Sequence, residues 1–288
     1  MYYSTYSHFE NPKELARGLL FNDEGVAINA SSTKYASEIN LLFPSYFGLV
    51  CYNHFLKTKN ATSLALFWKQ VNFLAENGTW EHSNYLLFYD FDYIKFELKA
   101  PWISGITQAL AASLFIRAHL EQPAAQWEKM IEGCVAPMLN PVQNGGLLAS
   151  TANGSPWVEE YPSNSPSLVL NGFIFCIISA FEYAAFTDRP SDVSRVSAWC
   201  ESMVKNLHHY TYGQYIRHNL KHWDFSNIEY QGLNIFQFVH LYQITKQPLF
   251  RKLAHQYHQH INWDSFYNFY GIEPKRIIIE EFFNPKDL

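Results

Sequence analysis

The sequence predicts a mainly α-helical protein in which antiparallel helical hairpins form an incomplete α/α barrel (toroid), with short β-hairpins in the connecting loops. Apolar residues recur at helical spacing over most of the chain, and the helical stretches follow one another in pairs. Loops rich in Tyr, Gly, Asn and Pro recur on alternate connections, as expected for stacked helical hairpins. A globular bundle that does not close into a ring fits the same pattern.

The helical pattern starts near residue 44, and Asn77-Gly78 ends the second helix. Residues 79–103 break the period, and their Tyr and Phe rich part, 85–99, predicts a strand or hairpin whose side chains face a site. Further helices are predicted at 104–120, 124–138, 167–185, 192–208, 228–245 and 249–262. Between them, 140–161 predicts a hairpin or long functional loop, and 209–226 predicts a loop rich in Tyr, His and Arg.

Composition favours one large globular domain over residues 1–288, because 48% of the residues are hydrophobic and only 16% are charged. The last residues, 263–288, predict an irregular or β-type tail. Aromatic residues are abundant, with 8 Trp, 19 Tyr and 23 Phe. Most are expected in the core, but flat aromatic rings also line carbohydrate clefts.

Charge and cysteine content exclude several classes of function. The net charge of −5 provides no basic field for nucleic acid, so no nucleic-acid partner is expected. The four cysteines are far apart and predict reduced core residues. No basic segment followed by a long apolar run opens the chain, and the most apolar stretch, 168–180, is too short to span a membrane. We therefore expect a cytoplasmic protein without a membrane span.

Three segments carry candidate functional residues. The first, PWISGITQALAASLFIRAHL, contains Trp102, Gln108 and Arg117; the second is WVEEYPSNSPSLVLNGFIF, residues 157–175; the third is YGQYIRHNLKHWDF, residues 212–225. In their order and spacing these segments resemble D-glucuronyl C5-epimerases, and the resemblance covers about residues 40–262. It implies an isomerase that converts D-glucuronate to L-iduronate residues in a polysaccharide such as heparosan, or in an oligosaccharide. No cofactor or metal is implied, and family analogy suggests a homodimer.

The resemblance also implies the site residues. Tyr161 is implied as a proton-transfer group, and Glu160 as a carboxylate that assists it or takes the proton itself. The third segment departs from the family, because Phe225 stands where the family has a tyrosine implicated in catalysis. We expect Tyr215 to be the replacement, and next Tyr212, Tyr230 or His218. The substrate-binding residues implied are Trp102, Gln108, Arg117, Trp157, Glu159, Asn171, His218, Trp223 and Asp224.

The chemistry of C5 inversion explains why these residue types are needed. The reaction removes a proton next to a carboxylate, so negative charge develops on a group that is already negative, and cations or strong donors stabilise it. Arg217 and His218 are the candidates, since a guanidinium grips a carboxylate with two hydrogen bonds. A tyrosine acts as a base near neutral pH only when a nearby cation lowers its pKa. We expect Arg217 to have this effect on Tyr161.

Structural interpretations of the same residues remain open. Glu159 and Glu160 also fit a solvated turn, Trp102 and Gln108 fit packing and capping, and Arg217 fits a structural ion pair with Asp224 or Glu229. The histidines His255, His258 and His260 fit a solvated helix face better than a metal site.

Three other functions also fit. A lyase uses the same C5 carbanion and requires only one proton-transfer group. A glycoside hydrolase requires two carboxylates, here Glu160 with Asp224. The third alternative is a non-catalytic glycan-binding homologue.

Overall fold

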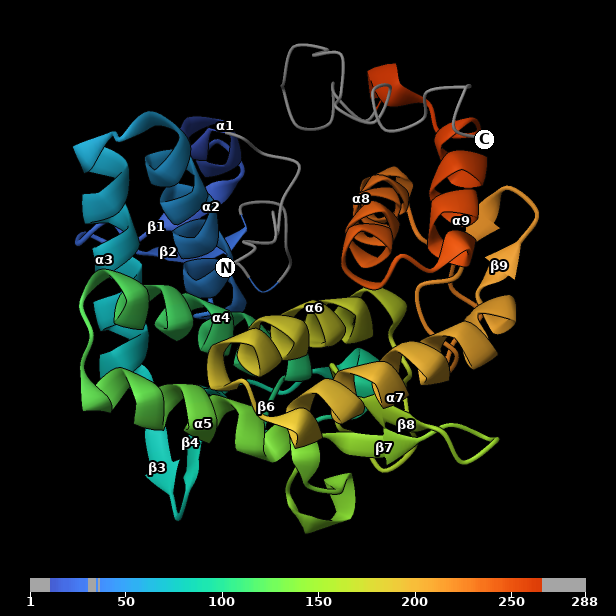
Figure 1. Cartoon of the computed structure of the whole chain (residues 1–288), viewed down its shortest axis with the longest axis horizontal. Coiled ribbons are helices and arrows are strands. Elements are labelled where there is room, and N and C mark those ends of the chain that lie inside the picture. The colour runs from blue at the N-terminus through green and yellow to red at the C-terminus, as the bar shows by residue number, and fades with distance from the viewer. Residues whose placement is uncertain (1–10, 31–34, 36, 266–288) are drawn as a thin grey trace.

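The computed structural model describes residues 11–30, 35 and 37–265 (Figure 1). Its body consists of antiparallel helix pairs, which confirms the predicted fold class of helical hairpins in an incomplete α/α barrel. The pairs are α2 (Leu42–Thr58) with α3 (Ala61–Asn77), α4 (Gly105–Glu121) with α5 (Ala125–Leu139), α6 (Leu170–Thr187) with α7 (Pro190–Asn206), and α8 (Ile228–Thr245) with α9 (Pro248–His258). A short helix, α1 (Pro12–Ala16), precedes them.

Helices α2, α4, α6 and α8 form an inner row in which each contacts the next, and the other helix of each pair packs outside. In Figure 1, α2 and α8 stand on opposite sides of the molecule with α4 and α6 between them. Most buried apolar side chains between Leu15 and Tyr257 form one main core, a smaller cluster gathers around Phe96 and Trp102, and α4 and α6 are buried on nearly every side. The four cysteines are free and buried in this core, as predicted.

Helix α6 is the one helix in the described part of the chain that is long and apolar enough to cross a membrane. Most of it is buried inside the protein, however, as is typical of the central helix of a core. The apolar stretch predicted at 168–180 therefore belongs to a longer, buried helix.

The turns inside the helix pairs are short and follow from local sequence. Lys59, Asp188 and Lys246 end α2, α6 and α8 in the left-handed conformation, with φ of 59°, 53° and 57°. A left-handed residue at this position ends a helix and turns the chain back. Prolines then start α7 and α9 at Pro190 and Pro248, where the missing N–H has no cost. The carboxyl ends of the inner helices are therefore joined to the outer helices by short turns, without long loops.

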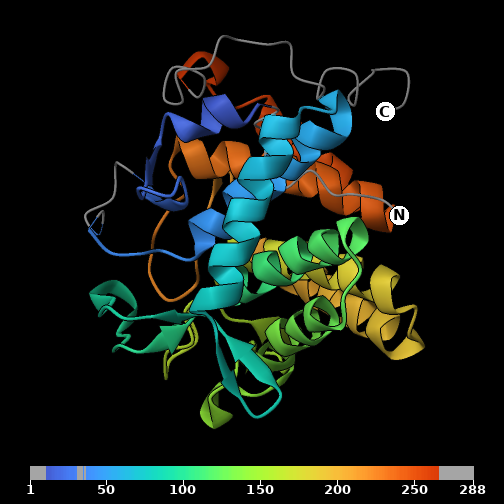
Figure 2. The ribbon, with the colours of Figure 1, turned by 90° about the vertical axis from the view of Figure 1, so that its left-hand side faces the viewer.

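The long connections lead to the amino ends of the inner helices. They contain two-stranded antiparallel sheets, as the decorated loops predicted. The strands are β1 (Leu19–Phe21) with β2 (Ala27–Ala30), β3 (Thr79–Glu81) with β4 (Asn84–Leu86), β5 (Phe88–Tyr89) with β6 (Trp102–Ile103), β7 (Leu148–Ser150) with β8 (Pro156–Val158), and β9 (Thr211–Tyr212) with β10 (Tyr215–Ile216). The β3–β4 hairpin projects from the body in both views (Figures 1 and 2).

Most predicted helix boundaries agree with the structure to within two residues, with two exceptions. Helix α6 starts at Leu170 rather than at 167, because the amides of Ser167 and Leu168 donate to the carboxylate of Glu159 instead of entering the helix. Helix α9 ends at His258 rather than at 262. The hairpin at 19–30 was not predicted, and most of the predicted tail, 266–288, lies outside the described residues.

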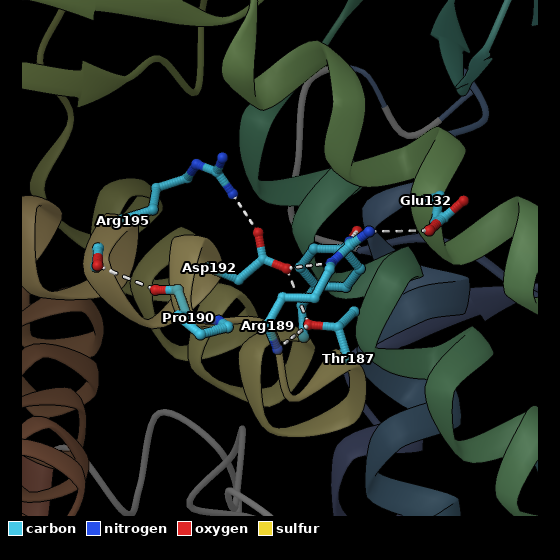
Figure 3. A network of polar contacts seen from close by, with 8 residues as sticks. Glu132, Thr187, Arg189, Pro190, Asp192 and Arg195 are labelled. Atoms are coloured by element: carbon cyan, nitrogen blue, oxygen red, sulfur yellow. Dashed lines mark hydrogen bonds and ion pairs between the residues drawn. The ribbon is translucent and has the colours of Figure 1, made fainter.

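A charged network holds the α6–α7 turn against α5 (Figure 3). The carboxylate of Asp192 accepts hydrogen bonds from Thr187 at 2.8 Å, from Arg189 Nε at 2.8 Å and from Arg195 at 2.5 Å. Arg189 also reaches Glu132 on α5 at 3.4 Å. The network closes the turn end of the barrel, away from the long loops.

A buried ion pair joins α4 to α6 in the middle of the inner row. The guanidinium of Arg117 donates to both carboxylate oxygens of Glu182 at 2.8 and 2.9 Å, and Arg117 is 0% exposed. The predicted substrate-binding role of Arg117 does not agree with this burial. We interpret Arg117 as the partner of a buried carboxylate that links two core helices.

Replacing Arg117 removes both hydrogen bonds that its guanidinium donates to the buried carboxylate of Glu182, and breaking a buried ion pair in this way typically costs about 3 to 5 kcal/mol. We therefore expect Arg117→Met to lower the free energy of unfolding by roughly that amount, measured by urea denaturation. Restoring apolar packing at both positions in Arg117→Met/Glu182→Leu should recover part of the loss. An Arg117→Met variant as stable as the wild type would contradict a role in the core.

Candidate active site

The segment Glu159-Glu160-Tyr161 follows β8 and is fixed by its backbone. The amide of Glu159 donates to the carbonyl of Leu147 at 2.8 Å, and its carbonyl accepts from the amide of Gly105 at 3.1 Å. A Cβ on Gly105 would lie 2.3 Å from that carbonyl oxygen, so only glycine permits the approach. The segment is therefore held at the amino end of α4.

Glu159 organises the loop that leads into α6. Its side chain is 0% exposed, and its carboxylate accepts from the amides of Ser167 and Leu168, each at 3.0 Å, and from the Ser167 hydroxyl. These hydrogen bonds use both oxygens of the Glu159 carboxylate inside the protein. We therefore assign Glu159 a structural role in place of the predicted substrate contact, and the solvated turn proposed for this pair does not form.

Glu160 is the buried carboxyl group of the site, with 6% of its surface exposed. Its Oε2 atom has no hydrogen-bond partner within the described structure and lies against Gly172, where a Cβ would come within 2.4 Å. Burial raises the pKa of Glu160 to about 7, the nearby phenol of Tyr161 opposes this shift, and the charge of Glu159 adds to it. The carboxyl group is thus poised to exchange a proton near neutral pH.

Tyr161 lies beside Glu160 among aromatic rings. Its ring stacks on Phe96 with centroids 4.1 Å apart, and Tyr93 and Trp102 lie at 5.1 and 6.0 Å. Burial, together with the negative charge of Glu160, raises the pKa of Tyr161 well above its usual value. The expectation that a cation lowers the pKa of Tyr161 is therefore wrong, and the phenol keeps its proton at neutral pH.

Two further phenols interact with Glu160. Tyr93, from the loop before α4, packs its ring beside that of Tyr161; burial and the charge of Glu160 raise the pKa of Tyr93 to about 12. Tyr230, in the first turn of α8, interacts electrostatically with both Glu160 and Tyr161, and burial is the main cause of its raised pKa. Two phenols from long connections and one from the first turn of α8 therefore interact with one carboxyl group.

His218 faces Tyr230, with ring centroids 5.1 Å apart. Burial lowers the pKa of His218 to about 4, so the imidazole is neutral near pH 7. Its carbonyl accepts from the amide of Leu170 at 3.0 Å, which ties this loop to the start of α6. The predicted cation at this position is therefore a neutral group that stabilises charge only by donating a hydrogen bond.

Two ion pairs join the loop before α4 to the loop before α8. Lys95 contacts Asp224 at 2.6 Å, and Lys221 contacts Glu97 at 2.8 Å. The Lys221 side chain is 10% exposed whereas Glu97 is 70% exposed, and Lys221 also reaches Ser163 at 3.3 Å. Lys221 is therefore a largely covered cation that contacts Ser163, two positions after Tyr161 in the sequence, and its anionic partner Glu97 is exposed to solvent.

The expected pair Arg217 and Tyr215 lies on the β9–β10 hairpin. Arg217 donates to the carbonyl of His222 at 3.1 Å, and its guanidinium lies 4.5 Å from the ring centroid of Trp223. Tyr215 is 45% exposed and accepts from Gln214 at 2.8 Å. Asp224, the predicted partner of Arg217, is paired with Lys95, which outweighs the effect of burial and lowers the pKa of Asp224.

The remaining candidates divide between packing and the site. Gln108 is fully buried and bridges Leu87 N and Tyr85 O at 2.9 and 2.8 Å. Trp157 is 0% exposed and stacks on Phe173, so we interpret both as core residues. Trp102 belongs to the aromatic cluster around Tyr161. Asn171 precedes Gly172 in the first turn of α6, its Oδ1 has no partner among the described residues, and its substrate-binding role stays a prediction.

The family described as "D-glucuronyl C5-epimerase C-terminus" matches residues 80–259, which is more than half of the chain and includes every element of this site. The chain belongs to this family. The epimerase assignment agrees with the predicted enzyme class, an isomerase acting on carbohydrates.

Solved structures share the fold at low sequence identity. The cellobiose 2-epimerase of Spirochaeta thermophila has a TM-score of 0.55 at 11% identity, over 86% of this chain and 65% of that one. The GH76 α-mannanase BT2949 of Bacteroides thetaiotaomicron has a TM-score of 0.55 at 12% identity, over 81% and 60%. The Lin0763 protein of Listeria innocua has a TM-score of 0.54 at 14% identity, over 88% and 69%. The chain thus spans about two thirds of their length, and the likeness supports the fold alone.

Within this epimerase family member, several site residues were not singled out from the sequence. Tyr93 and Phe96 lie in the stretch 85–99 that was predicted to face a site, but nothing in the pattern distinguished them from their aromatic neighbours. Lys221 lies in the third segment, but Arg217 and His218 in the same segment were predicted to be the groups that stabilise the substrate carboxylate. Tyr230 ranked after Tyr215 as the predicted second proton-transfer group, because distance from the motif in the sequence does not show which side chains meet in the folded protein.

Burial of Glu160 predicts a pH effect on stability. Its pKa is about 7 in the folded protein against 4.5 for the free group, so the folded state binds more protons between these values and stability falls as the pH rises through them. Glu160→Gln removes this dependence. Relative to wild type, we expect the variant to gain about 2 to 3 kcal/mol in the free energy of unfolding between pH 4 and pH 8.

Urea denaturation at these two pH values measures the difference, and Glu201→Gln, on the solvent side of α7, is the matched control with no expected pH effect. A constant difference between wild type and Glu160→Gln across the range would show that Glu160 titrates normally.

Proposed function

We propose that the protein is a C5-epimerase that converts D-glucuronate to L-iduronate residues within a polysaccharide or oligosaccharide, such as unsulfated heparosan. The observation that carries the proposal is the pair of Glu160, whose buried carboxyl group has its pKa raised to about 7, and the adjacent phenol of Tyr161, which interacts with that carboxyl group. A base of this pKa is half ionised at neutral pH and regains its acid form just as readily. Membership of the C5-epimerase family supports the same reaction.

In the first step the phenol oxygen of Tyr161 takes the proton from C5 while the phenol's own proton passes to Glu160. Glu160 is nearly fully buried, whereas Tyr161 is only partly covered, so a relay through Tyr161 reaches the substrate without exposing the carboxylate. The C5–H bond breaks, its electron pair enters the ene-diolate of the uronate, and Glu160 becomes neutral. Neutralising a buried carboxylate removes its desolvation cost.

The charge that develops on the substrate carboxylate needs a cation, and Lys221 supplies it. Lys221 is buried, near Ser163, and its partner Glu97 is exposed enough to turn into solvent when a substrate carboxylate arrives. The amino ends of α4, α6 and α8 converge on the same side of the barrel, and their partial positive charge adds to this stabilisation. Lys221 thus takes the role that the sequence assigned to Arg217.

The second step returns a proton to the opposite face of C5. Tyr230 is the candidate, because it comes from α8, whereas the ring of Tyr93 packs beside that of Tyr161 with centroids 5.1 Å apart. A protonated phenol is the required state for a donor, and burial keeps Tyr230 protonated. The presence of Tyr230 favours epimerisation over β-elimination, since a lyase needs no second proton donor on the sugar ring.

Proton exchange in D2O tests the function. Incubation with unsulfated heparosan, followed by NMR, is expected to show deuterium at C5 together with iduronate signals, with a rate that rises through about pH 7 as Glu160 ionises. Tyr230→Phe should lower inversion by roughly 10²-fold, because the second donor is lost. Tyr215→Phe, which also removes one hydroxyl, is the matched comparison and should lower inversion far less.

Other outcomes would identify the alternatives. Ultraviolet absorbance from an unsaturated uronate would establish a lyase, and new reducing ends without deuterium would establish a hydrolase. If Tyr215→Phe were as damaging as Tyr230→Phe, the second proton donor would lie on the β9–β10 hairpin after all. Binding of heparosan without exchange, unchanged by Glu160→Gln, would mark a non-catalytic homologue.

A further inference from the structure

The β9–β10 hairpin and the residues after it carry a cluster of exposed aromatic rings. Trp223 is 69% exposed, Tyr212 60% and Tyr215 45%. All three surround the ring of Phe225, with centroid distances of 5.7, 5.9 and 5.8 Å. We call these four residues the aromatic platform. Phe225, which cannot exchange a proton, serves here as the centre on which the other rings pack.

Local backbone geometry directs the rings of the platform to one side. Tyr212 and Tyr215 are opposite each other across a two-residue turn in which Gly213 has φ of 59°, so their side chains share a face. Ile216 points the other way and is fully buried. The hairpin therefore anchors one face in the core and presents the other, aromatic face to solvent.

Arg217 fixes the orientation of the most exposed ring. Its guanidinium lies 4.5 Å from the Trp223 centroid and covers one face of the indole, while its Nη2 donates to the carbonyl of His222. The large exposure of Trp223 shows that much of the remaining indole surface is in water. A ring held in one orientation loses little entropy when a ligand stacks on it, and a contiguous apolar surface of this kind marks a binding site.

The aromatic platform is continuous with the candidate active site through its neighbours in sequence. His222, next to Trp223, contacts Phe96 with centroids 5.5 Å apart, and Phe96 stacks on Tyr161. Asp224, on the other side of Trp223, is bound to Lys95 from the same loop as Phe96. A chain-like ligand with one unit at Tyr161 therefore has its next units near the platform.

We propose that the aromatic platform is a subsite that binds a pyranose ring flanking the reacting uronate, so that the enzyme recognises a chain rather than a single sugar. The proposal rests on the proposed function. Sugar rings present apolar C–H faces that stack on flat aromatic rings, and the phenol hydroxyls of Tyr212 and Tyr215 add polar partners at the edge. The adjacent cations Arg217 and Lys95 favour a chain that carries carboxylates. Tyr215 thereby contributes to chain binding and not to proton transfer.

Titration calorimetry with heparosan fragments tests the subsite. Wild type is expected to bind an octasaccharide more tightly than a disaccharide, because only the longer fragment reaches from Tyr161 to the platform. Trp223→Ala and, separately, Tyr212→Ala should weaken octasaccharide binding about tenfold and disaccharide binding by less than about twofold, as expected for loss of one aromatic anchor. Trp80→Ala removes an exposed tryptophan from the distant β3–β4 hairpin and should change neither affinity.

Three results would overturn the proposal. Equal losses of affinity for the octasaccharide and the disaccharide would place Trp223 at the reacting sugar, and no loss of affinity for either fragment would exclude the platform from binding. A Trp223→Ala variant whose sedimentation coefficient shifts from dimer to monomer would make the platform a surface for a second copy of the chain. The proposed function is tested separately by deuterium exchange into the octasaccharide. Length-dependent binding that needs Trp223, without exchange, would keep the subsite and reject the epimerase; exchange without length dependence would do the reverse.

Discussion

The short turn between the helices of each pair is the constraint on which the rest of the structure depends. Left-handed residues such as Lys59, Asp188 and Lys246 end the inner helices abruptly, and a link of only two or three residues leads to the outer helix. With one end of the barrel used for these turns, all long connections must meet at the amino ends of the inner helices. Tyr93, Tyr161 and His218 come from three different connections and meet there for that reason. The position of the site is a consequence of chain connectivity.

Burial, rather than a neighbouring cation, controls protonation in this site. Gly172 lets Glu160 pack against α6, and the resulting loss of water raises the pKa of Glu160 to about 7. The same desolvation keeps Tyr161 and Tyr230 protonated. A base poised near neutrality and phenols that retain their protons are complementary requirements for moving a proton from one face of a carbon to the other. The departure of Phe225 from the family pattern is compatible with this arrangement, because Phe225 lies on the aromatic platform.

Local and tertiary information contributed differently to the prediction of the fold and the site. Helix positions followed from apolar periodicity, and only the start of α6 and the end of α9 differed noticeably. At the start of α6 the carboxylate of Glu159 binds backbone amides that would otherwise enter the helix. Glu160 and Tyr161 were recognised because they form a contiguous motif. Arg217 and Tyr215 were preferred to Lys221 and Tyr230, since closeness to a motif in the sequence does not determine which side chains reach the site.

The sequence by itself determined the helical hairpins, the alternation of short and long connections, and the motif that relates the chain to C5-epimerases. These properties depend on residue type and spacing along a continuous segment, which are present before folding. Only the tertiary structure showed that Glu159 and Arg117 are buried against partners inside the protein, that His218 is neutral, and that Lys221 is largely covered and contacts Ser163. Desolvation and charge pairing depend on atoms brought together from distant segments, so a linear pattern does not contain them.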